Sequence, residues 1–326
     1  MRAIRMDETG GPQVLRPVEI DRPEPGEGQV LIRVAAAGVN FTDVMARQGI
    51  YVTRDGMPAL PVVPGSEVAG IVAAVGPGVL EPVVGSRVAA LVNGGYAEYA
   101  VAPSELAYPL PENVDFAEAV AYLVQGITAW QLLQDCARLH AGERVLVHSA
   151  AGGVGTLAVQ LAKEFGASAV IATAGSRPKL DLAAELGADV CVDYTGADWS
   201  QEVLSATDGQ GVDVVLDAVG GDVTEQSLAC LAPFGRLMVY GVSSKRLASF
   251  AGSQLMHKNQ TVGGYWLRSR MAQDKSSTDV VPKLLKLAGE NRLKAVVRHA
   301  FPLEQAAESH QAISDRRTVG KVVLLT

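Results

Sequence analysis

The chain has 326 residues, of which 48% are hydrophobic and 19% are charged, and its formal net charge is −7. This length and composition predict two ordinary domains with a sizeable buried core. The acidic balance, without a Lys/Arg-rich run, argues against nucleic acid as the main partner, and no uninterrupted apolar stretch is long enough to cross a membrane. The first residues, 1–7, lack the apolar region of a signal peptide, so we expect a cytoplasmic protein.

The first 124 residues have the pattern of short strands separated by glycine and proline. A hairpin is expected from residues 1–6 and 14–20, and a strong strand follows at 29–38. Further short strands are expected at 68–75, 87–92 and 96–101. This spacing predicts a compact, partly closed β domain.

The pattern changes at about residue 125 to alternating strands and helices. An apolar strand at 145–147 leads into a glycine turn at 150–155, and a helix with apolar residues at helical spacing follows. Four more strands are expected at 168–173, 189–193, 213–217 and 235–241, with helices between them. This alternation predicts an α/β domain over residues 125–262, with a doubly wound parallel sheet and helices on both faces.

The last part of the chain, from about residue 263, contains helices near 280–288 and 303–314. It ends in an apolar strand at 320–326. Because a strand this apolar requires burial, we expect it to return to the first domain. That domain is then discontinuous and consists of residues 1–124 and 263–326.

The glycine turn has the spacing of a dinucleotide-binding turn, although Ala150 stands where the first glycine is usual. A pyrophosphate needs backbone N–H donors at a helix N-terminus and no side chain in the way. Gly152 can let the backbone approach the phosphates, and Gly155 can let the helix pack close to the strand. Because the turn follows a strand and opens a helix, it predicts a dinucleotide site. A purely structural glycine turn is the alternative.

The second strand of this region ends without the acidic residue that would hold the ribose 2′-hydroxyl of NAD. Two cations, Arg177 and Lys179, follow instead at the start of a helix, where positive charge opposes the helix dipole. A 2′-phosphate can pair with these cations, and backbone N–H groups near Gly175 and Ser176 can cradle it. The pattern favours NADPH over NADH; the alternative is that the cations only decorate the helix.

The block VHSAAGGVGTLAVQLAK at 147–163 resembles the signature of zinc-independent quinone oxidoreductases, which belong to the medium-chain dehydrogenase/reductase superfamily. Supporting blocks are AAGVNFTD at 36–43, PGSEVAG at 64–70, GYAEYAV at 95–101 and GKVVL at 320–324. The resemblance covers the whole chain. It implies a GroES-like, mostly β catalytic domain and a Rossmann-type cofactor domain that binds NADPH.

The chain departs from the zinc-dependent relatives at the metal ligands. Those relatives carry a cysteine at the position of Asn40 and a histidine at the position of Ser66. The four-cysteine zinc lobe is also missing, and the three cysteines present form no C-x-x-C motif. Since zinc needs three or four converging ligands, we expect no metal site.

The resemblance also implies the cofactor contacts. In the family a glycine, a lysine and a tyrosine clasp the 2′-phosphate, and they match Gly175, Lys179 and Tyr194. The complete expected set is Asn40, Thr128, Ala151, Gly152, Gly153, Val154, Gly155, Gly175, Ser176, Arg177, Lys179, Tyr194, Val219, Gly220, Tyr240, Gly241, Val242, Ser243 and Arg316.

Without zinc, a carbonyl oxygen lacks a strong Lewis acid, so a conjugated acceptor is the easier substrate. Hydride addition to a β-carbon or a quinone ring leaves negative charge on an oxygen, which hydrogen-bond donors can stabilise. Tyr51 and Asn40 are the expected donors, and Asp43 is expected to orient the site rather than to act as a base. These residues predict an NADPH-dependent reductase of quinones or α,β-unsaturated carbonyl compounds.

Two other functions stay open. One is an enoyl-thioester reductase, for which Arg268 and Arg270 could contribute to a basic patch, and the other is a non-catalytic NADPH-binding protein with a structural or sensor role. The resemblance also implies a homodimer. The strand at 235–241 and the residues that follow could leave an apolar sheet edge, and pairing of two such edges would join the two copies of the homodimer.

Overall fold

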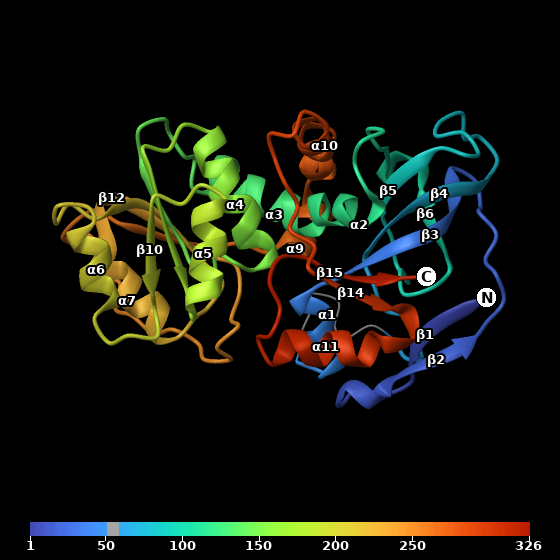
Figure 1. The fold of residues 1–326 in the computed structure, drawn as a ribbon, viewed down its shortest axis with the longest axis horizontal. Helices are drawn as coiled ribbons and strands as arrows, with labels where there is room; N and C mark the ends of the chain where they lie inside the picture. The colour runs from blue at the N-terminus through green and yellow to red at the C-terminus, as the bar shows by residue number, and fades with distance from the viewer. Residues whose placement is uncertain (51–58) are drawn as a thin grey trace. The chain divides into compact units, whose positions relative to one another are not determined.

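The computed structural model describes residues 1–50 and 59–326, and these form two compact units. The first unit comprises Met1–Ile127 and Asp274–Thr326, without the undescribed segment, and the second comprises Thr128–Gln273. Figure 1 shows mostly β structure in the first unit and alternating strands and helices in the second. Both ends of the chain lie in the first unit, so that unit is built from two separate stretches of sequence.

The first unit consists of short strands with a few helices. Its strands and α-helices are β1 (Arg2–Met6), β2 (Leu15–Glu19), β3 (Gln29–Val39), α1 (Phe41–Arg47), β4 (Glu67–Val75), β5 (Arg87–Leu91), β6 (Tyr99–Pro103), β7 (Ala107–Pro109), α2 (Phe116–Ala119), α3 (Val124–Gln131, which continues into the second unit), α10 (Val281–Gly289), β14 (His299–Pro302), α11 (Ala306–Ser314) and β15 (Val322–Leu325).

The centre of the first unit is β3, which pairs antiparallel with β4, β6 and β15. The main sheet has the order β14-β15-β3-β4-β5-β7, and β1 and β2 form a separate antiparallel hairpin, as expected. The side chains of Val30, Ile32 and Val34 on β3 are almost fully buried in the core of this unit. The pairing of β15 with β3 confirms that the apolar C-terminal strand returns to the β domain.

The second unit alternates strands and helices. Its elements are β8 (Arg144–Val147), α4 (Gly153–Glu164), β9 (Ala169–Ala174), α5 (Arg177–Glu185), β10 (Val190–Asp193), α6 (Trp199–Ser205), β11 (Val212–Asp217), α7 (Asp222–Cys230), β12 (Leu231–Val239), α8 (Ser253–Met256), β13 (Thr261–Gly264) and α9 (Leu267–Gln273).

All neighbouring strands of the second unit run parallel, in the order β10-β9-β8-β11-β12-β13. This is the strand order of a dinucleotide-binding Rossmann sheet. Figure 1 shows α4 and α5 on one side of the sheet and α6 and α7 on the other. The order reverses between β8 and β11, so the turns that follow these two strands flank the crevice where such sheets bind ligands.

The expectation of a sheet edge at residues 235–241 is wrong. The corresponding strand, β12, pairs with β11 on one side and with β13 on the other. The four-residue β13 contains Gly263 and Gly264, and glycine weakens the sequence signal for a strand. On this side the edge strand of the sheet is therefore β13, and the opposite edge strand is β10.

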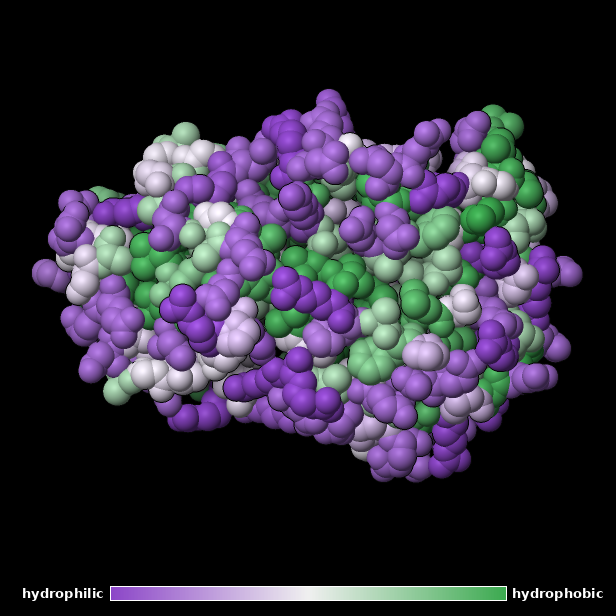
Figure 2. Space-filling view, in the orientation of Figure 1, coloured by the Kyte–Doolittle hydropathy of each residue, from purple (hydrophilic) through white to green (hydrophobic). Residues whose placement is uncertain are grey.

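The visible surface in Figure 2 is mostly hydrophilic, with hydrophobic areas between. Hydrophobic colour at the upper right lies over the β4–β5 side of the first unit, where Leu80, Val83 and Val84 are exposed. Within residues 1–50 and 59–326, the helices are too short or too polar to span a bilayer.

Candidate functional site

The glycine turn after β8 leaves the start of α4 open. Gly152 is the N-cap of this helix, and among the described residues no side chain caps it. A Cβ on Gly155 would lie 2.7 Å from Ala150 Cα, so glycine is required there by the packing of the helix on the turn. A Cβ on Gly152 would approach Ser149 O at 3.2 Å. The backbone N–H groups of Gly153, Val154 and Gly155 in the first turn can bind an anion.

A second open helix start lies at the end of β9. Ser176 is the N-cap of α5, without a side-chain cap among the described residues. A Cβ on Gly175 would lie 3.8 Å from Tyr194 Oη, so this tyrosine borders the turn. Lys179 belongs to the first turn of α5, whereas the exposed Arg177 forms an ion pair with Asp181 at 2.7 Å. Gly175, Ser176, Lys179 and Tyr194 therefore lie at or beside this helix start.

The turn after β11 is fixed by a buried carboxylate. Asp217 Oδ1 accepts hydrogen bonds from the N–H groups of Val219 at 2.7 Å and Gly220 at 3.3 Å. Its Oδ2 accepts a hydrogen bond from the Thr224 hydroxyl. The N–H groups of Val219 and Gly220 are thus engaged within the protein, and the turn is held in one conformation beside the glycine turn.

The turn after β12 packs on the turn after β11. Tyr240 N donates to Asp217 O at 2.9 Å, and Ser243 N donates to Ala218 O at 2.9 Å. A Cβ on Gly241 would lie 3.0 Å from Ala218 O, and Val242 Cγ1 lies near Gly220. The residues expected after the fourth and fifth strands, including Val242, therefore lie together at the carboxyl ends of β11 and β12.

A buried histidine lies beneath these turns. His148 Nδ1 contacts Thr173 Oγ1 at 2.7 Å, and Nε2 contacts Ser227 Oγ at 2.7 Å. Since the Ser227 hydroxyl donates to Val223 O at 2.6 Å, its oxygen accepts from Nε2–H, and Thr173 donates to Nδ1. Burial lowers the pKa of His148 to about 4, so the ring is neutral at pH 7. We call His148, Thr173 and Ser227 the histidine cluster.

In the first unit, strand register brings three separate blocks of the sequence together. On β3 and β4, Ala37 pairs with Val68, so Gly38 and Glu67 are the next neighbours. On β3 and β15, Val39 pairs with Val322, so Asn40 and Lys321 follow at the strand ends. The three blocks around residues 38–40, 67 and 321 therefore meet at one end of the sheet.

These residues form a buried charged cluster, which we define as Asn40, Glu67, Gln125 and Lys321. The Lys321 ammonium forms an ion pair with Glu67 Oε1, and both side chains are 0% exposed. Lys321 Nζ also donates to Asn40 Oδ1 at 2.9 Å, and Asn40 Nδ2 donates to Glu67 Oε1 at 2.7 Å. Gln125 Nε2 donates to Asn40 Oδ1 at 3.2 Å.

Two backbone features make room for the buried carboxylate of Glu67. A Cβ on Gly38 would lie 2.7 Å from Glu67 Cγ and 2.8 Å from Cδ, so only glycine fits at this position. The N–H of Val124, at the start of α3, donates to Glu67 Oε2 at 2.8 Å. Both carboxylate oxygens are therefore hydrogen-bonded inside the protein.

Asp43 lies on α1, next to the charged cluster. Its carboxylate accepts from Asn40 N at 2.8 Å in a capping box and from the Tyr96 hydroxyl at 3.1 Å. His310 Nε2 lies 3.1 Å from the same hydroxyl, and burial lowers the pKa of His310 to about 3. Burial raises the pKa of Asp43 to about 6. These contacts give Asp43 an orienting position at the start of α1.

Other expected residues are spread along the chain. Thr128 is buried in α3, and Arg316 is exposed just after α11. Tyr51, the other expected hydrogen-bond donor, lies outside the described residues. The residues that sequence reasoning missed are Glu67, Tyr96, Gln125, His310 and Lys321. Glu67 and Lys321 belong to the blocks at 64–70 and 320–324. Each is a charged residue next to an apolar strand, and this position was the available signal that it is buried and paired.

The donor atoms near Asn40 do not suit a metal ion. Among the described residues, no three His, Cys, Asp or Glu side chains converge as a metal site. Instead, the cation beside Asn40 and Glu67 is the ammonium of Lys321. A divalent ion at this position would be repelled by that charge.

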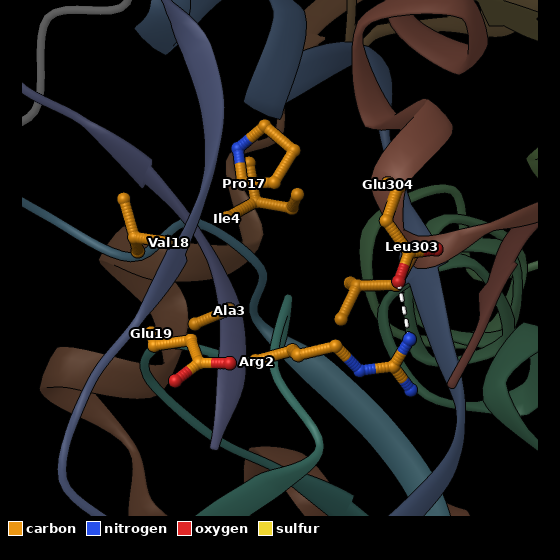
Figure 3. A pocket seen from close by; sticks show the side chains of 8 residues that line it. All are labelled: Arg2, Ala3, Ile4, Pro17, Val18, Glu19, Leu303 and Glu304. Carbon is orange, nitrogen blue, oxygen red and sulfur yellow. Dashed lines mark hydrogen bonds and ion pairs between the residues drawn. The ribbon is translucent and has the colours of Figure 1, made fainter.

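A surface pocket lies elsewhere in the first unit, between β1, β2 and the turn that precedes α11 (Figure 3). Its charged wall is Arg2, which pairs with Glu304 and with Glu98. None of the expected site residues lines it.

Family models match both parts of the chain. Residues 26–112 match the alcohol dehydrogenase GroES-like domain, and residues 153–297 match the zinc-binding dehydrogenase domain. Together with the Rossmann sheet of the second unit, these matches define a medium-chain dehydrogenase/reductase.

Similar proteins indicate the family within this superfamily. The quinone oxidoreductase of Pseudomonas aeruginosa is 37% identical over 333 residues, covering 99% of each chain. The human synaptic vesicle membrane protein VAT-1 homolog is 36% identical over 93% of this chain and 80% of its own length. The structure of Escherichia coli quinone oxidoreductase complexed with NADPH is 32% identical, with a TM-score of 0.91 over 100% of both chains. The chain belongs to the quinone oxidoreductase family of this superfamily.

Proposed function

We propose that this protein transfers hydride from NADPH to a quinone or an α,β-unsaturated carbonyl compound, without a catalytic metal. The observation that carries the proposal is the pair of open helix starts in the second unit, at Gly152 and Ser176, at adjacent strand ends. A dinucleotide with an extra phosphate has two anionic groups for two such sites. The NADPH complex of the Escherichia coli relative supports the same cofactor.

The residues of the second unit fit this cofactor. The open space at Gly152 and the N–H groups of the first turn of α4 suit a pyrophosphate. Gly175, Lys179 and Tyr194 would hold the 2′-phosphate, because a cation and hydroxyl donors border an uncapped helix start. Bound NADPH would supply a hydride, and the protein would supply position and electrostatics.

The first unit supports a conjugated acceptor. Its charged cluster offers hydrogen-bond donors and the ammonium of Lys321, and no ligand set for zinc is found among the described residues. Hydride addition to a quinone or an enone leaves charge on an oxygen, and a preorganised N–H donor can stabilise that charge. Asn40 and Tyr51 stay the predicted donors, and the single N–H that Asn40 has left after its bond to Glu67 serves one ligand group at a time.

The test is NADPH oxidation by the purified protein with three acceptor classes: a naphthoquinone, an enone and a crotonyl-thioester. We expect turnover with the quinone or the enone. Faster turnover of the thioester would instead support an enoyl reductase. Protein that binds NADPH, as measured by fluorescence titration, but oxidises it with none of the three would contradict the enzymatic proposal.

We also propose that the protein is a homodimer joined through β13. This strand is one of the two edges of the second sheet, and among the described residues no further strand pairs with its outer side. Pairing two such edges about a two-fold axis would extend the sheet. Sedimentation equilibrium should give a dimer, and Val262→Pro, which removes an N–H donor in β13, should shift the population toward monomer.

A further inference from the structure

The charged cluster holds one side-chain amide between a cation and an anion. We propose that the Glu67–Lys321 ion pair is a positioning device that fixes the amide orientations of Asn40 and Gln125, so that the two present one N–H donor and one C=O acceptor to a bound ligand. The proposal rests on the proposed function only for the ligand, NADPH, that is used in its test.

Each charged group of the cluster has a single hydrogen-bonding role. An ammonium can only donate hydrogen bonds, and a carboxylate can only accept them. Lys321 Nζ lies 2.9 Å from Asn40 Oδ1, and Glu67 Oε1 lies 2.7 Å from Asn40 Nδ2. A flipped amide would set N–H groups against the ammonium and an oxygen against the carboxylate. The ion pair therefore allows one orientation of Asn40, although an amide in neutral surroundings can adopt either.

The orientation passes from Asn40 to Gln125. Because Asn40 presents Oδ1, its neighbour Gln125 must present Nε2, and the two atoms lie 3.2 Å apart. This leaves Gln125 Oε1 buried without a hydrogen-bond partner among the described residues. Gln125 is only 9% exposed, and a buried acceptor without a partner carries a desolvation cost. Such an atom points to a ligand that donates a hydrogen bond to it.

The ligand chemistry follows from the groups of this cluster that have no partner among residues 1–50 and 59–326. Asn40 Nδ2 carries two hydrogens, and one of them is donated in the hydrogen bond to Glu67 Oε1. The second N–H of Asn40 and the carbonyl of Gln125 form a donor and an acceptor on neighbouring side chains. A hydroxyl or a carboxamide group matches this pair, since each both accepts and donates.

Buried charge also strengthens the donor. The ammonium of Lys321 polarises the Asn40 amide through Oδ1, and polarisation along a hydrogen-bond chain makes the opposite N–H a better donor. The ion pair thus has a role beyond stability. A buried ion pair often contributes little to stability compared with an apolar pair of the same volume. A variant that replaces both charged residues by uncharged ones of similar volume is therefore expected to fold.

The test compares the wild-type protein with the double variant Glu67→Gln/Lys321→Met, which removes both charges and nearly preserves volume. NMR of protein labelled with ¹⁵N at asparagine reports on the Asn40 side-chain amide, which is assigned by its loss in Asn40→Ala. We expect its resonances to move in the double variant, and NADPH affinity or kcat/KM to fall about tenfold or more. Lys286→Met, at an exposed lysine of α10, is the matched control. It should change neither the Asn40 resonances nor the NADPH affinity nor kcat/KM.

Two outcomes would overturn the proposal. One is a folded double variant with unchanged Asn40 resonances, NADPH affinity and kcat/KM. The other needs no variant: in the wild type, nuclear Overhauser contacts should join the Asn40 amide protons to Glu67 Hγ, and contacts to Lys321 Hε instead would show the opposite orientation. The NMR readouts and the NADPH affinity do not depend on turnover, so failure of every acceptor would refute the proposed function and leave this inference standing.

Discussion

The two units each bury a polar cluster, and the clusters satisfy their hydrogen bonds by different means. The charged cluster of the first unit is held by an ammonium and a carboxylate, whereas the histidine cluster of the second unit is held by the hydroxyls of Thr173 and Ser227. A hydroxyl can rotate and either donate or accept, but an ion cannot exchange these roles. Charged partners therefore impose an orientation, and hydroxyl partners adapt to one.

The clusters also differ in what they leave unpaired. In the histidine cluster, both ring nitrogens of His148 have partners. In the charged cluster, Gln125 Oε1 has none among the described residues. An acceptor without a partner in the described part of the chain is therefore found in the charged cluster, whereas both ring nitrogens of His148 are engaged within the protein.

The largest expected effect tests how tightly the charged cluster is built. Gly38→Ala would place a methyl group 2.7 Å from Glu67 Cγ and push the carboxylate away from Lys321. We expect the free energy of unfolding, measured by urea denaturation, to fall by about 3 kcal/mol or more.

The matched control for this change is Gly264→Ala on β13, where a Cβ would meet no atom within 4 Å. It should alter the free energy of unfolding by less than about 1 kcal/mol. Equal effects of the two substitutions would show that Glu67 can move freely, and the contrast between the clusters would be lost.

The next effect is the pH dependence of stability. An unfolded histidine titrates near 6.5, whereas burial lowers the pKa of His148 to about 4 and that of His310 to about 3. As the pH falls from 6.5 to 5, the unfolded chain binds more protons, so each histidine lowers stability by roughly 2 kcal/mol. Urea denaturation at these two pH values measures the loss from both histidines together with the opposing contribution of Asp43.

Asp43 opposes this trend. Burial raises its pKa from 3.8 to about 6, so the folded state holds the proton between these values and stability from this group rises as the pH falls. Asp43→Asn should therefore steepen the acid loss of stability, and His148→Asn should reduce it. Slopes that do not differ from that of the wild type would contradict the assignment of these groups.

A smaller effect concerns ligand binding in the second unit, where the open turns predict changes in affinity rather than in stability. Lys179→Ala should weaken NADPH binding about tenfold and leave NADH binding unchanged, since only NADPH carries the 2′-phosphate. Fluorescence titration with both cofactors gives the ratio. A parallel loss of NADH affinity would point to a disturbed turn instead.

The smallest effect is expected at Arg177. Its ion pair with Asp181 is exposed, with 86% of the arginine side chain accessible, and such pairs contribute little. Arg177→Ala should change the free energy of unfolding by less than about 0.5 kcal/mol. A loss of NADPH affinity as large as that of Lys179→Ala would show that Arg177 leaves Asp181 to bind the phosphate.

Local patterns were sufficient for the parallel sheet and the glycine turn, because each strand, turn and helix is signalled by neighbouring residues. The short β13 was missed since two of its four residues are glycine. The charged cluster was missed for another reason: Asn40 and Lys321 are separated by 281 positions, and only strand register brings them together. Glu67 and Lys321 lie in the blocks at 64–70 and 320–324 that carry the family resemblance. Neither block by itself predicts the residue with which its charged side chain pairs.

The ion pair between Glu67 and Lys321 joins positions separated by 254 residues, with the entire second unit between them. Ribosomes deliver the chain from its N-terminus, so Glu67 emerges long before its counterion. The second unit can complete its sheet while synthesis continues, but the first must wait with a carboxylate that has no cation to pair with. Premature termination before residue 321 would therefore leave a finished nucleotide-binding unit attached to an unfinished β domain, and such truncated chains should be prone to degradation.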